Sequence, residues 1–368
     1  MLYLGIDQHR KQLTVNLRNE AGEVILRRQV STEWARVRKF LEELRERSVA
    51  AGGFVAIVEV CGFNDWLLKL LREYGCRETV LVQPEKQSKK KTDRRDANTL
   101  GELLWVNRQR LLAGQRIQGL RRVELPTAAV AEDRQITELR KRLGQSRTRT
   151  VNRIKGLLRK HNLEQECPTK GLDTIRGRKW LVGLTLGAID RLELDALLTQ
   201  WDLWDKQIET VEKEIKRRQK QSLTACVVST MPGAGAYGSL ALAARLGRIE
   251  RFPRPASLAN YWGLTPGCRN SGEATDRLGS ITKQGSATAR FILGQIVLHV
   301  LRRDGTMRAW YLRIKKRRGS KIARVAVMRR LATILWHMVK YNEPYQIGGP
   351  LRLRLSAKTK PEKTKQSA

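Results

Sequence analysis

Four acidic residues stand where a strand ends or a helix begins, and such positions can bring carboxylates from distant segments together. Asp7 ends the apolar run LYLGID, and Glu59 lies in the apolar run FVAIVEV at 54–60. Asp93 and Asp96 are spaced i, i+3, so a helix that starts there carries both on one face. Carboxylates in apolar surroundings are costly unless they are paired or bind a metal. We therefore predict that the four bind two divalent cations, Mg²⁺ or Mn²⁺.

Two cations could hold the attacking and leaving oxygens of a phosphodiester displacement. Three of these carboxylates, each taken alone, also have a simpler interpretation. Asp93 and Asp96 can cap a helix, and Asp7 can close a strand turn, whereas Glu59 is harder to explain. The histidines, at positions 9, 161, 299 and 337, are dispersed and show no metal-ligand spacing. We predict that they are structural or face nucleic acid.

A second candidate lies far along the chain, in a loop dense in glycine. Ser271 is followed by Gly272 and is surrounded by Arg269, Arg277 and Lys283. A hydroxyl is a weak nucleophile until a base, a metal or a cationic environment activates it. A glycine loop lets a phosphate backbone approach, and the cations can stabilise charge on it. The simpler interpretation is a plain turn, because Asn-Ser-Gly is a strong turn sequence.

The charge balance indicates a polyanionic partner. Lys and Arg total 72 against 36 acidic residues, a formal net charge of +36. Such a surplus favours nucleic acid, although composition alone also allows a ribosomal-type or membrane-surface protein. The basic run at 308–330 is predicted to contact nucleic acid, with a solvated helix face as the alternative. The basic residues predicted to bind nucleic acid, besides those of the glycine loop, are Lys89, Lys90, Lys91, Lys315, Lys316, Arg317 and Arg318.

The N-terminal elements needed to position the carboxylates follow from hydrophobic periodicity. The expected order is strand 2–7, a hairpin of strands 12–18 and 23–30, helix 33–48, strand 54–60, a helix capped by Asn64 and running to about Tyr74, strand 78–83, and a helix from about 94 to 112. A hairpin followed by alternating strands and helices is the ribonuclease H-like layout. In that fold, the ends of the first and fourth strands and a flanking helix meet.

The rest of the chain is predicted to be mainly helical. Segments 128–165 and 190–222 are long, charged helices, which favour an antiparallel coiled-coil arm over an ordinary bundle. Beyond 225 come the glycine-rich turn MPGAGAYGS, a helix near 286–303 and an amphipathic helix ending near Tyr341. We predict four parts: an α/β RuvC-like (ribonuclease H-like) domain at 1–125, the coiled-coil arm at 126–224, a mainly α C-terminal domain at 225–345, and a basic disordered tail at 346–368.

The cysteines and the hydropathy profile point to a reducing compartment. The five cysteines are scattered and form no CxxC pair, so neither a zinc knuckle nor a disulfide framework is expected. No signal-peptide pattern and no segment that approaches a membrane span occur in the sequence. We therefore expect a cytoplasmic protein with no membrane partner.

Several motifs resemble one known family across nearly the whole chain. They are LGID, VEVCG and KTDRRDANTL in the N-terminal half, and MPGAGAYGSLALAARLG, RFPRPASLANYWGLTP, NSGEATDRLGSITKQGSATAR and KKRRGSKIARVAVMRRLATILW in the C-terminal half. The sequence is similar to the DEDD-type insertion-sequence transposases of the IS-one-ten class, which include the Piv-type invertases. Cys268-Arg269-Asn270 before the serine and the long basic tail are unusual, but they leave the motifs intact.

The resemblance carries expectations about individual residues. Asp7, Glu59, Asp93 and Asp96 match the acidic tetrad of a RuvC-like domain that binds magnesium, and Ser271 matches the serine proposed to form a covalent phosphoserine link with DNA. The resemblance also implies a prokaryotic protein with a guide (bridge) RNA that pairs with donor and target DNA. It implies dimers that pair into tetramers, with an active site shared between the RuvC-like domain of one subunit and the serine domain of another.

Three functions remain in competition at this point. The first is a DNA recombinase, a transposase, that works through a serine intermediate. The second is a hydrolytic metal-dependent nuclease of the Holliday-junction resolvase kind, in which Ser271 only shapes a turn. The third is a non-catalytic RNA-binding or assembly protein, for which Glu59→Ala would change neither cleavage nor recombination.

Overall fold

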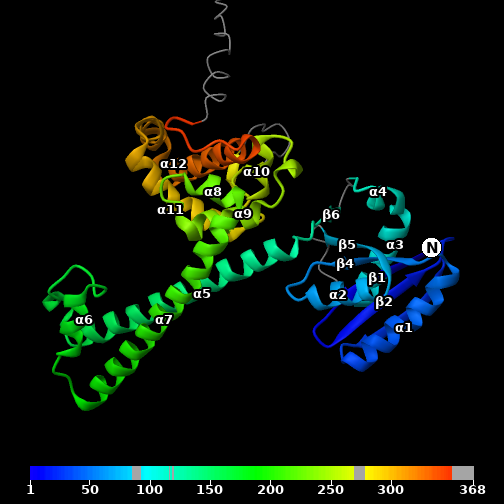
Figure 1. Cartoon of the computed structure of the whole chain (residues 1–368), viewed down its shortest axis with the longest axis horizontal. Helices are drawn as coiled ribbons and strands as arrows, with labels where there is room; N and C mark the ends of the chain where they lie inside the picture. The colour runs from blue at the N-terminus through cyan, green and yellow to red at the C-terminus, as the bar shows by residue number, and fades with distance from the viewer. Residues whose placement is uncertain (85–92, 116, 118–119, 269–277, 350–368) are drawn as a thin grey trace, which may run out of the picture. The chain divides into compact units, whose positions relative to one another are not determined.

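A computed structural model describes residues 1–84, 93–115, 117, 120–268 and 278–349. The chain forms two compact units, Met1–Leu125 and Pro126–Ala368 (Figure 1). The first unit is built on a β-sheet and the second is mainly helical, which confirms the predicted α/β part followed by a mainly α part. Among the described residues, no helix combines the length and the apolar character needed to cross a bilayer.

The sheet of the first unit has six strands in the order β3-β2-β1-β4-β5-β6. Its strands are β1 (Leu2–Gln8), β2 (Gln12–Arg18), β3 (Val24–Ser31), β4 (Phe54–Glu59), β5 (Cys76–Pro84) and β6 (Leu120–Arg122). β1 is parallel to β4, and β4 is parallel to β5. The other neighbours are antiparallel. The first and fourth strands are therefore adjacent, with their carboxyl ends at the same edge of the sheet.

The strand pleat divides the side chains between two cores, because successive residues point to opposite faces. Leu4 and Ile6 pack in the core that contains α1 (Trp34–Ala50) and α2 (Asp65–Glu73). Tyr3 and Ile57 pack on the opposite face, against α3 (Asp93–Val106). Since alternate residues share a face, Asp7 and Glu59 lie on the α3 side.

Helix α3 crosses the sheet in close contact with β1. A Cβ atom at Gly5 would lie 2.4 Å from the backbone nitrogen of Gly101 and 2.6 Å from the carbonyl oxygen of Ala97. A side chain at Gly5 would therefore push the helix off the sheet. Gly5 therefore allows α3 to lie close to β1, the strand that carries Asp7.

The structure differs from the predicted N-terminal elements in three places. The helix predicted over 94–112 is divided at Asn107 into α3 and α4 (Arg108–Leu112), and the Asn107 side chain donates a hydrogen bond to the Leu103 carbonyl. Strand β6 was not predicted, because three residues give too short a pattern. Asn64 precedes α2, but its side chain makes no capping hydrogen bond to that helix.

The second unit begins with two long antiparallel helices, α5 (Ala128–Lys160) and α7 (Ala188–Gln221) (Figure 1). Contacts along their length run in opposite sequence directions: Arg218 with Asp133, Arg140 with Glu212, Arg147 with Asp205, and Trp204 with Thr150. At the far end, α6 (Ile175–Val182) and the buried Trp201 belong to a separate small core. That helix was not predicted within the segment joining the long helices.

The remaining helices share the largest core of the chain. They are α8 (Leu223–Ser229), α9 (Gly235–Leu246), α10 (Pro255–Tyr261), α11 (Ala287–Arg303) and α12 (Gly305–Tyr341). α12 is kinked at Gly319, which has non-helical angles. The buried Asp304 caps α12 and also accepts hydrogen bonds from the Tyr345 hydroxyl and the Gly348 amide. Burial opposes its ionisation, but these hydrogen bonds outweigh burial and lower the pKa of Asp304.

Candidate functional site

Two predicted carboxylates, Asp7 and Glu59, lie on neighbouring parallel strands. The register pairs Ile6 with Val58, so Asp7 and Glu59 stand one residue further along, side by side at the carboxyl ends of β1 and β4. Neighbouring strands are about 4.8 Å apart. Both residues face the α3 side of the sheet. The two residues are 52 positions apart in the sequence, with β2, β3 and α1 between their strands, and the pairing of β1 with β4 brings them to adjacent places.

The Asp7 side chain is held in a buried position. The residue is 7% exposed, and its Oδ2 lies 2.9 Å from Nε2 of His9. The sequence analysis gave His9 no site role, although its spacing of two residues from Asp7 along an extended chain is the signal that could have found this contact. This contact with His9 orients the Asp7 carboxylate.

A polar network joins the ends of β1 and β4 beside these carboxylates. Asn64 Nδ2 donates to Gln8 Oε1 at 2.8 Å and to the carbonyl oxygen of Glu59 at 3.1 Å. Asn64 Oδ1 accepts from the Cys61 amide at 2.6 Å, and Gln8 donates to the Phe63 carbonyl at 3.0 Å. Gln8 and Asn64 are each 5% exposed. The Asn64 side chain is used to hold the two strand ends together, which is why it does not cap α2.

The other two members of the predicted tetrad belong to α3. Asp93 is the first residue of that helix, and its side chain lies outside the described part of the structure. Asp96 is half-buried in the first turn. Within the described residues, no three His, Cys, Asp or Glu side chains are gathered as metal ligands. The structure thus brings Asp7 and Glu59 together but does not gather Asp96 with them.

The carboxylates that are described have the chemistry that a hard divalent cation requires. Mg²⁺ and Mn²⁺ prefer oxygen ligands, usually one or two carboxylates completed by water and phosphate oxygens. Buried Asp7 and its neighbour Glu59, at the carboxyl ends of two adjacent strands, fit that preference. Asp7 and Glu59 would supply the protein oxygens, and the helix that begins at Asp93 lies on the same face of the sheet.

The predicted serine lies in the second unit, within residues 269–277, which are outside the described residues. Arg269 and Arg277 fall in the same stretch. The flanking chain is a short antiparallel hairpin of β7 (Pro266–Cys268) and β8 (Leu278–Ile281), in which Cys268 pairs with Leu278. Lys283 follows β8 in a left-handed conformation with a φ of 55°. The sequence analysis predicted no strands here.

The base of this hairpin is fixed by close backbone contacts. A Cβ atom at Gly285 would lie 2.0 Å from the Tyr261 carbonyl oxygen, and one at Gly263 would lie 2.3 Å from the Gln284 carbonyl oxygen. Arg290 donates to the carbonyl oxygens of Trp262 and Gln284 at 3.1 and 2.9 Å. Desolvation lowers the pKa of Arg290. These contacts fix the point from which the serine-containing segment starts and returns.

Gly285→Ala is expected to destabilise the second unit by about 3 kcal/mol, because it combines a positive φ with a backbone clash. That loss should lower the thermal unfolding midpoint by roughly 6 to 12 °C. The matched control is Gly294→Ala in α11, where a Cβ atom would meet nothing within 4 Å. The control should be neutral or stabilising by about 0.5 to 1 kcal/mol. Equal midpoints for the two variants would contradict the role of Gly285.

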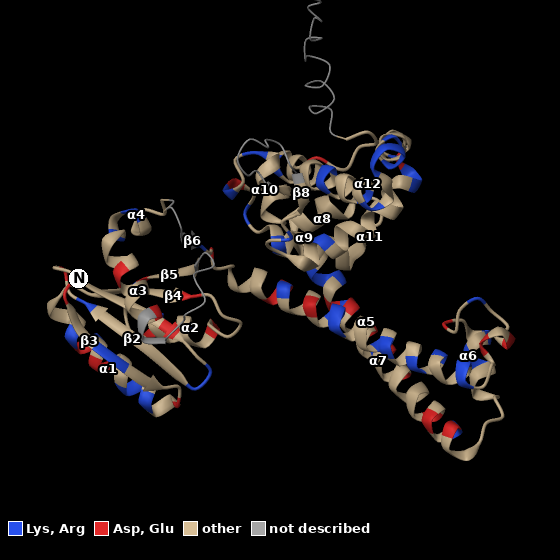
Figure 2. Cartoon of the chain, turned by 180° about the vertical axis from the view of Figure 1, so that it is seen from behind, with Lys and Arg blue, Asp and Glu red and all other residues tan. Residues whose placement is uncertain are grey.

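The basic residues predicted to contact nucleic acid are only partly described. Lys315, Lys316, Arg317 and Arg318 form an exposed run on α12, immediately before the kink at Gly319, and basic residues along this helix can be followed in Figure 2. Among the described residues, none of these four cations has a carboxylate partner within ion-pair distance. Lys89, Lys90 and Lys91 lie outside the described residues.

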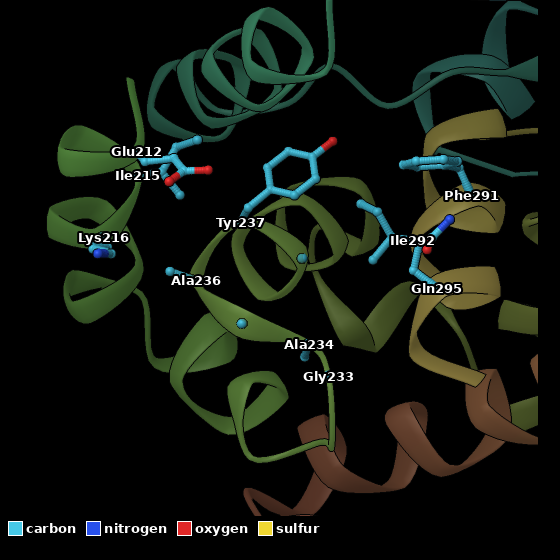
Figure 3. A pocket seen from close by; sticks show the side chains of 12 residues that line it. Glu212, Ile215, Lys216, Gly233, Ala234, Ala236, Tyr237, Phe291, Ile292 and Gln295 are labelled. Atoms are coloured by element: carbon cyan, nitrogen blue, oxygen red, sulfur yellow. The ribbon is translucent and has the colours of Figure 1, made fainter. Parts of the chain in front are cut away.

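The glycine-rich turn at 233–235 lies beside a cavity of about 250 Å³. Figure 3 shows side chains of α7, among them Glu212 and Ile215, on one side and side chains of α11, among them Phe291 and Ile292, on the other. Tyr237 of α9 stands between them. None of the predicted catalytic or nucleic-acid-binding residues lines this cavity.

Comparisons with known proteins bear on both units. Residues 225–312 match the family model described as "Transposase IS116/IS110/IS902 family", and residues 4–163 match a DEDD transposase model of the IS110 type, described as "Transposase". The chain is 26% identical over 310 residues to "Transposase for insertion sequence element IS1111A" of Coxiella burnetii, covering 79% of each chain.

A second relative covers more of the chain. It is the "Probable family 20 transposase" of Pseudomonas aeruginosa, 25% identical over 361 residues, which are 94% of this chain and 98% of the relative. The matches span both the carboxylate-bearing sheet and the serine-containing helical region, in agreement with the resemblance drawn from the motifs. The chain belongs to the IS110/IS116/IS902 family of insertion-sequence transposases.

Proposed function

We propose that this transposase cuts and rejoins donor and target DNA through a magnesium-dependent carboxylate site and a covalent phosphoserine intermediate. The observation that carries the proposal is the placement of Asp7 beside Glu59 at the ends of adjacent parallel strands, on the face crossed by α3. In this proposal Asp93 and Asp96 complete the metal-binding tetrad, and Ser271 is the nucleophile. Manganese could replace magnesium, because both accept the same oxygen ligands.

The proposed strand cleavage exchanges one phosphorus–oxygen bond for another. The Ser271 oxygen forms a bond to phosphorus, the bond between phosphorus and the leaving sugar oxygen breaks, and the serine proton ends on that oxygen. The carboxylates would hold a divalent cation, and its positive charge would stabilise the phosphate oxygens during the exchange. Rejoining reverses the step with a sugar hydroxyl of the other DNA, so no external energy source is required.

The proposal includes a guide RNA transcribed from the same element, which pairs with donor and target DNA. The net charge of +36 supports it, because phosphate contacts supply affinity without sequence information. Base pairing would then choose the site, while the protein holds the duplexes by shape. The proposed assembly is a homodimer that pairs into a tetramer on DNA. The proposed domains are a RuvC-like domain at 1–125, a coiled-coil arm at 126–224, a serine domain at 225–345 and a basic tail at 346–368.

The deciding experiment looks for protein covalently attached to DNA. Purified protein, its candidate guide RNA, Mg²⁺ and end-labelled DNA are mixed, denatured and separated by size. Labelled protein that disappears when RNA or Mg²⁺ is omitted would support the proposal. Cleaved DNA with no labelled protein would instead favour a hydrolytic nuclease of the Holliday-junction kind, in which the carboxylates act alone.

The exposed basic run on α12 gives a separate prediction about binding. Replacing Lys315, Lys316, Arg317 and Arg318 by glutamine should flatten the plot of log binding constant against log salt by up to about 3 to 4 units, since each phosphate contact contributes about 0.9. The measurement is fluorescence anisotropy with labelled DNA at several salt concentrations. The control replaces four exposed cations of α1 by glutamine: Arg36, Lys39, Arg45 and Arg47. An equal change in slope for both variants would contradict a specific contact surface on α12.

A further inference from the structure

A groove of about 570 Å³ lies over β2 and β3 on the α3 side of the sheet. β3 is the edge strand, and α3 packs over β1 and β2, so the face of β3 beyond it is left open. The described residues that line the groove are Thr14, Val15, Asn16, Arg27, Arg28, Gln29, Ala97 and Asn98. No carboxylate is among them.

The strand register makes this groove continuous with the carboxylate pair. Asp7 pairs with Thr14 across β1 and β2, and Thr14 pairs with Gln29 across β2 and β3. Glu59, Asp7, Thr14 and Gln29 therefore form one row across four strands. At about 4.8 Å per strand, Gln29 lies about 10 Å from Asp7. The row thus leads from the carboxylates directly into the groove.

A second row lies two residues away and provides a cation. Gly5 pairs with Asn16, and Asn16 pairs with Arg27. The exposed Arg27 donates to Asn98 Oδ1 at 3.4 Å, and Asn16 Nδ2 donates to the same oxygen at 3.2 Å. Among the described residues, Arg27 has no carboxylate within ion-pair distance. A guanidinium held by an amide, rather than by an acid, keeps its charge available to a ligand.

A buried hydroxyl at the floor of the groove lacks a partner. Thr14 is 4% exposed, and within the described residues its Oγ1 makes no hydrogen bond. A buried polar group without a partner is costly, so its presence needs an explanation. Asn16 Oδ1 is also without a partner there, but it lies against Gly101 of α3 and so faces the helix. Thr14 is the group whose position beside Asp7 suits a bound phosphate oxygen.

The neighbouring arginine on the same strand serves a different purpose. Val15 pairs with Arg28, and Val15 belongs to the core that packs against α1. Arg28 forms an ion pair with Glu43 of α1 at 2.9 Å. Both side chains therefore lie on the face of the sheet opposite to the groove. Arg27 and Arg28 carry the same charge on opposite faces of one strand.

We propose that this groove binds the sugar–phosphate backbone of a DNA strand that leads to the carboxylate pair, with Arg27 as the phosphate-binding cation. The inference rests on the proposed function, since it places the DNA relative to the same carboxylates. Thr14, Gln29 and Asn98 offer uncharged hydrogen-bonding groups along the path, which suit phosphate and sugar contacts.

The test compares Arg27→Gln with Arg28→Gln in the full-length protein. Binding of a labelled single-stranded DNA is measured by anisotropy over roughly 50 to 200 mM salt. EDTA is present, so binding is separated from cleavage. Arg27→Gln should weaken binding about fivefold to tenfold near 100 mM salt and reduce the salt slope by about 0.7. Arg28→Gln should leave both within twofold of the wild type, and Arg27→Lys should recover most of the loss.

Two results would overturn the inference. Equal effects of Arg27→Gln and Arg28→Gln would show only the general effect of removing one charge. A loss confined to an RNA of the same sequence, with DNA binding unchanged, would assign the groove to RNA instead. Unfolding midpoints of the variants establish that each one is folded. Because no cleavage is measured, a failure here leaves the proposed serine and metal chemistry to be judged by the adduct experiment alone.

Discussion

Ser271→Ala is expected to abolish the covalent attachment of this transposase to DNA while leaving DNA binding unchanged. The substitution removes one oxygen, the atom proposed to bond to phosphorus, and alters no charge. Removing the nucleophile of a covalent mechanism costs at least about 10³-fold in rate. The amount of labelled protein formed with guide RNA and Mg²⁺, beside the amount of cleaved DNA, is the measurement.

The hairpin that flanks residues 269–277 offers a matched control for that variant. Ser280 lies in β8, on an exposed position of the same hairpin. Ser280→Ala makes the same chemical change a few residues away and should keep full adduct formation. If Ser271→Ala cleaves DNA at the wild-type rate, the serine has no covalent role and the carboxylate nuclease becomes the better description.

Asp7→Asn is expected to reduce DNA cleavage by about 10³-fold or more. The change keeps the size of the side chain but removes the negative charge that would hold a divalent cation, and cation stabilisation of a phosphate in reaction contributes several kcal/mol. Each 1.4 kcal/mol corresponds to tenfold in rate. Cleavage rates measured against Mg²⁺ concentration should show a large loss that added Mg²⁺ does not restore.

Two control experiments distinguish a direct loss of catalysis in Asp7→Asn from a loss caused by misfolding. Asp65→Asn removes an exposed carboxylate from the first turn of α2, and it should leave cleavage unchanged with a stability loss of about 0.3 to 1 kcal/mol. Mg²⁺ should also raise the unfolding midpoint of the wild type, because a ligand that binds the folded state stabilises it. Asp7→Asn should lose that shift. A folded Asp7→Asn protein that cleaves normally would exclude Asp7 from the reaction.

Local patterns in the sequence determined most of the helices and strands, and they singled out two of the candidate site residues, Asp7 and Glu59. Strands β1 to β5 alternate or run apolar over short stretches, and the long helices repeat their apolar residues at helical spacing, so both are fixed by nearby residues. Asp7 and Glu59 stood out because each interrupts an apolar strand. The division into an α/β part followed by a mainly helical part was confirmed, and so was the transposase family. The metal-binding tetrad, the serine mechanism, the RuvC-like fold and the coiled-coil arm remain predictions.

The tertiary structure decided which residues meet, because pairing between strands depends on register rather than on local pattern. Register places Asp7 beside Glu59 and, on its other side, beside Thr14, whose role no sequence pattern indicated. The same holds for Asn64, a good helix cap by composition, whose side chain instead joins two strand ends.

Close approaches were equally invisible in the sequence. Gly5 against Gly101 and Gly285 against Tyr261 are glycines because another backbone occupies the space of a side chain. Nothing within a few residues of either glycine records that neighbour. Hydrophobic spacing is a property of one segment and can be recognised there, whereas contacts between segments exist only once the chain has folded.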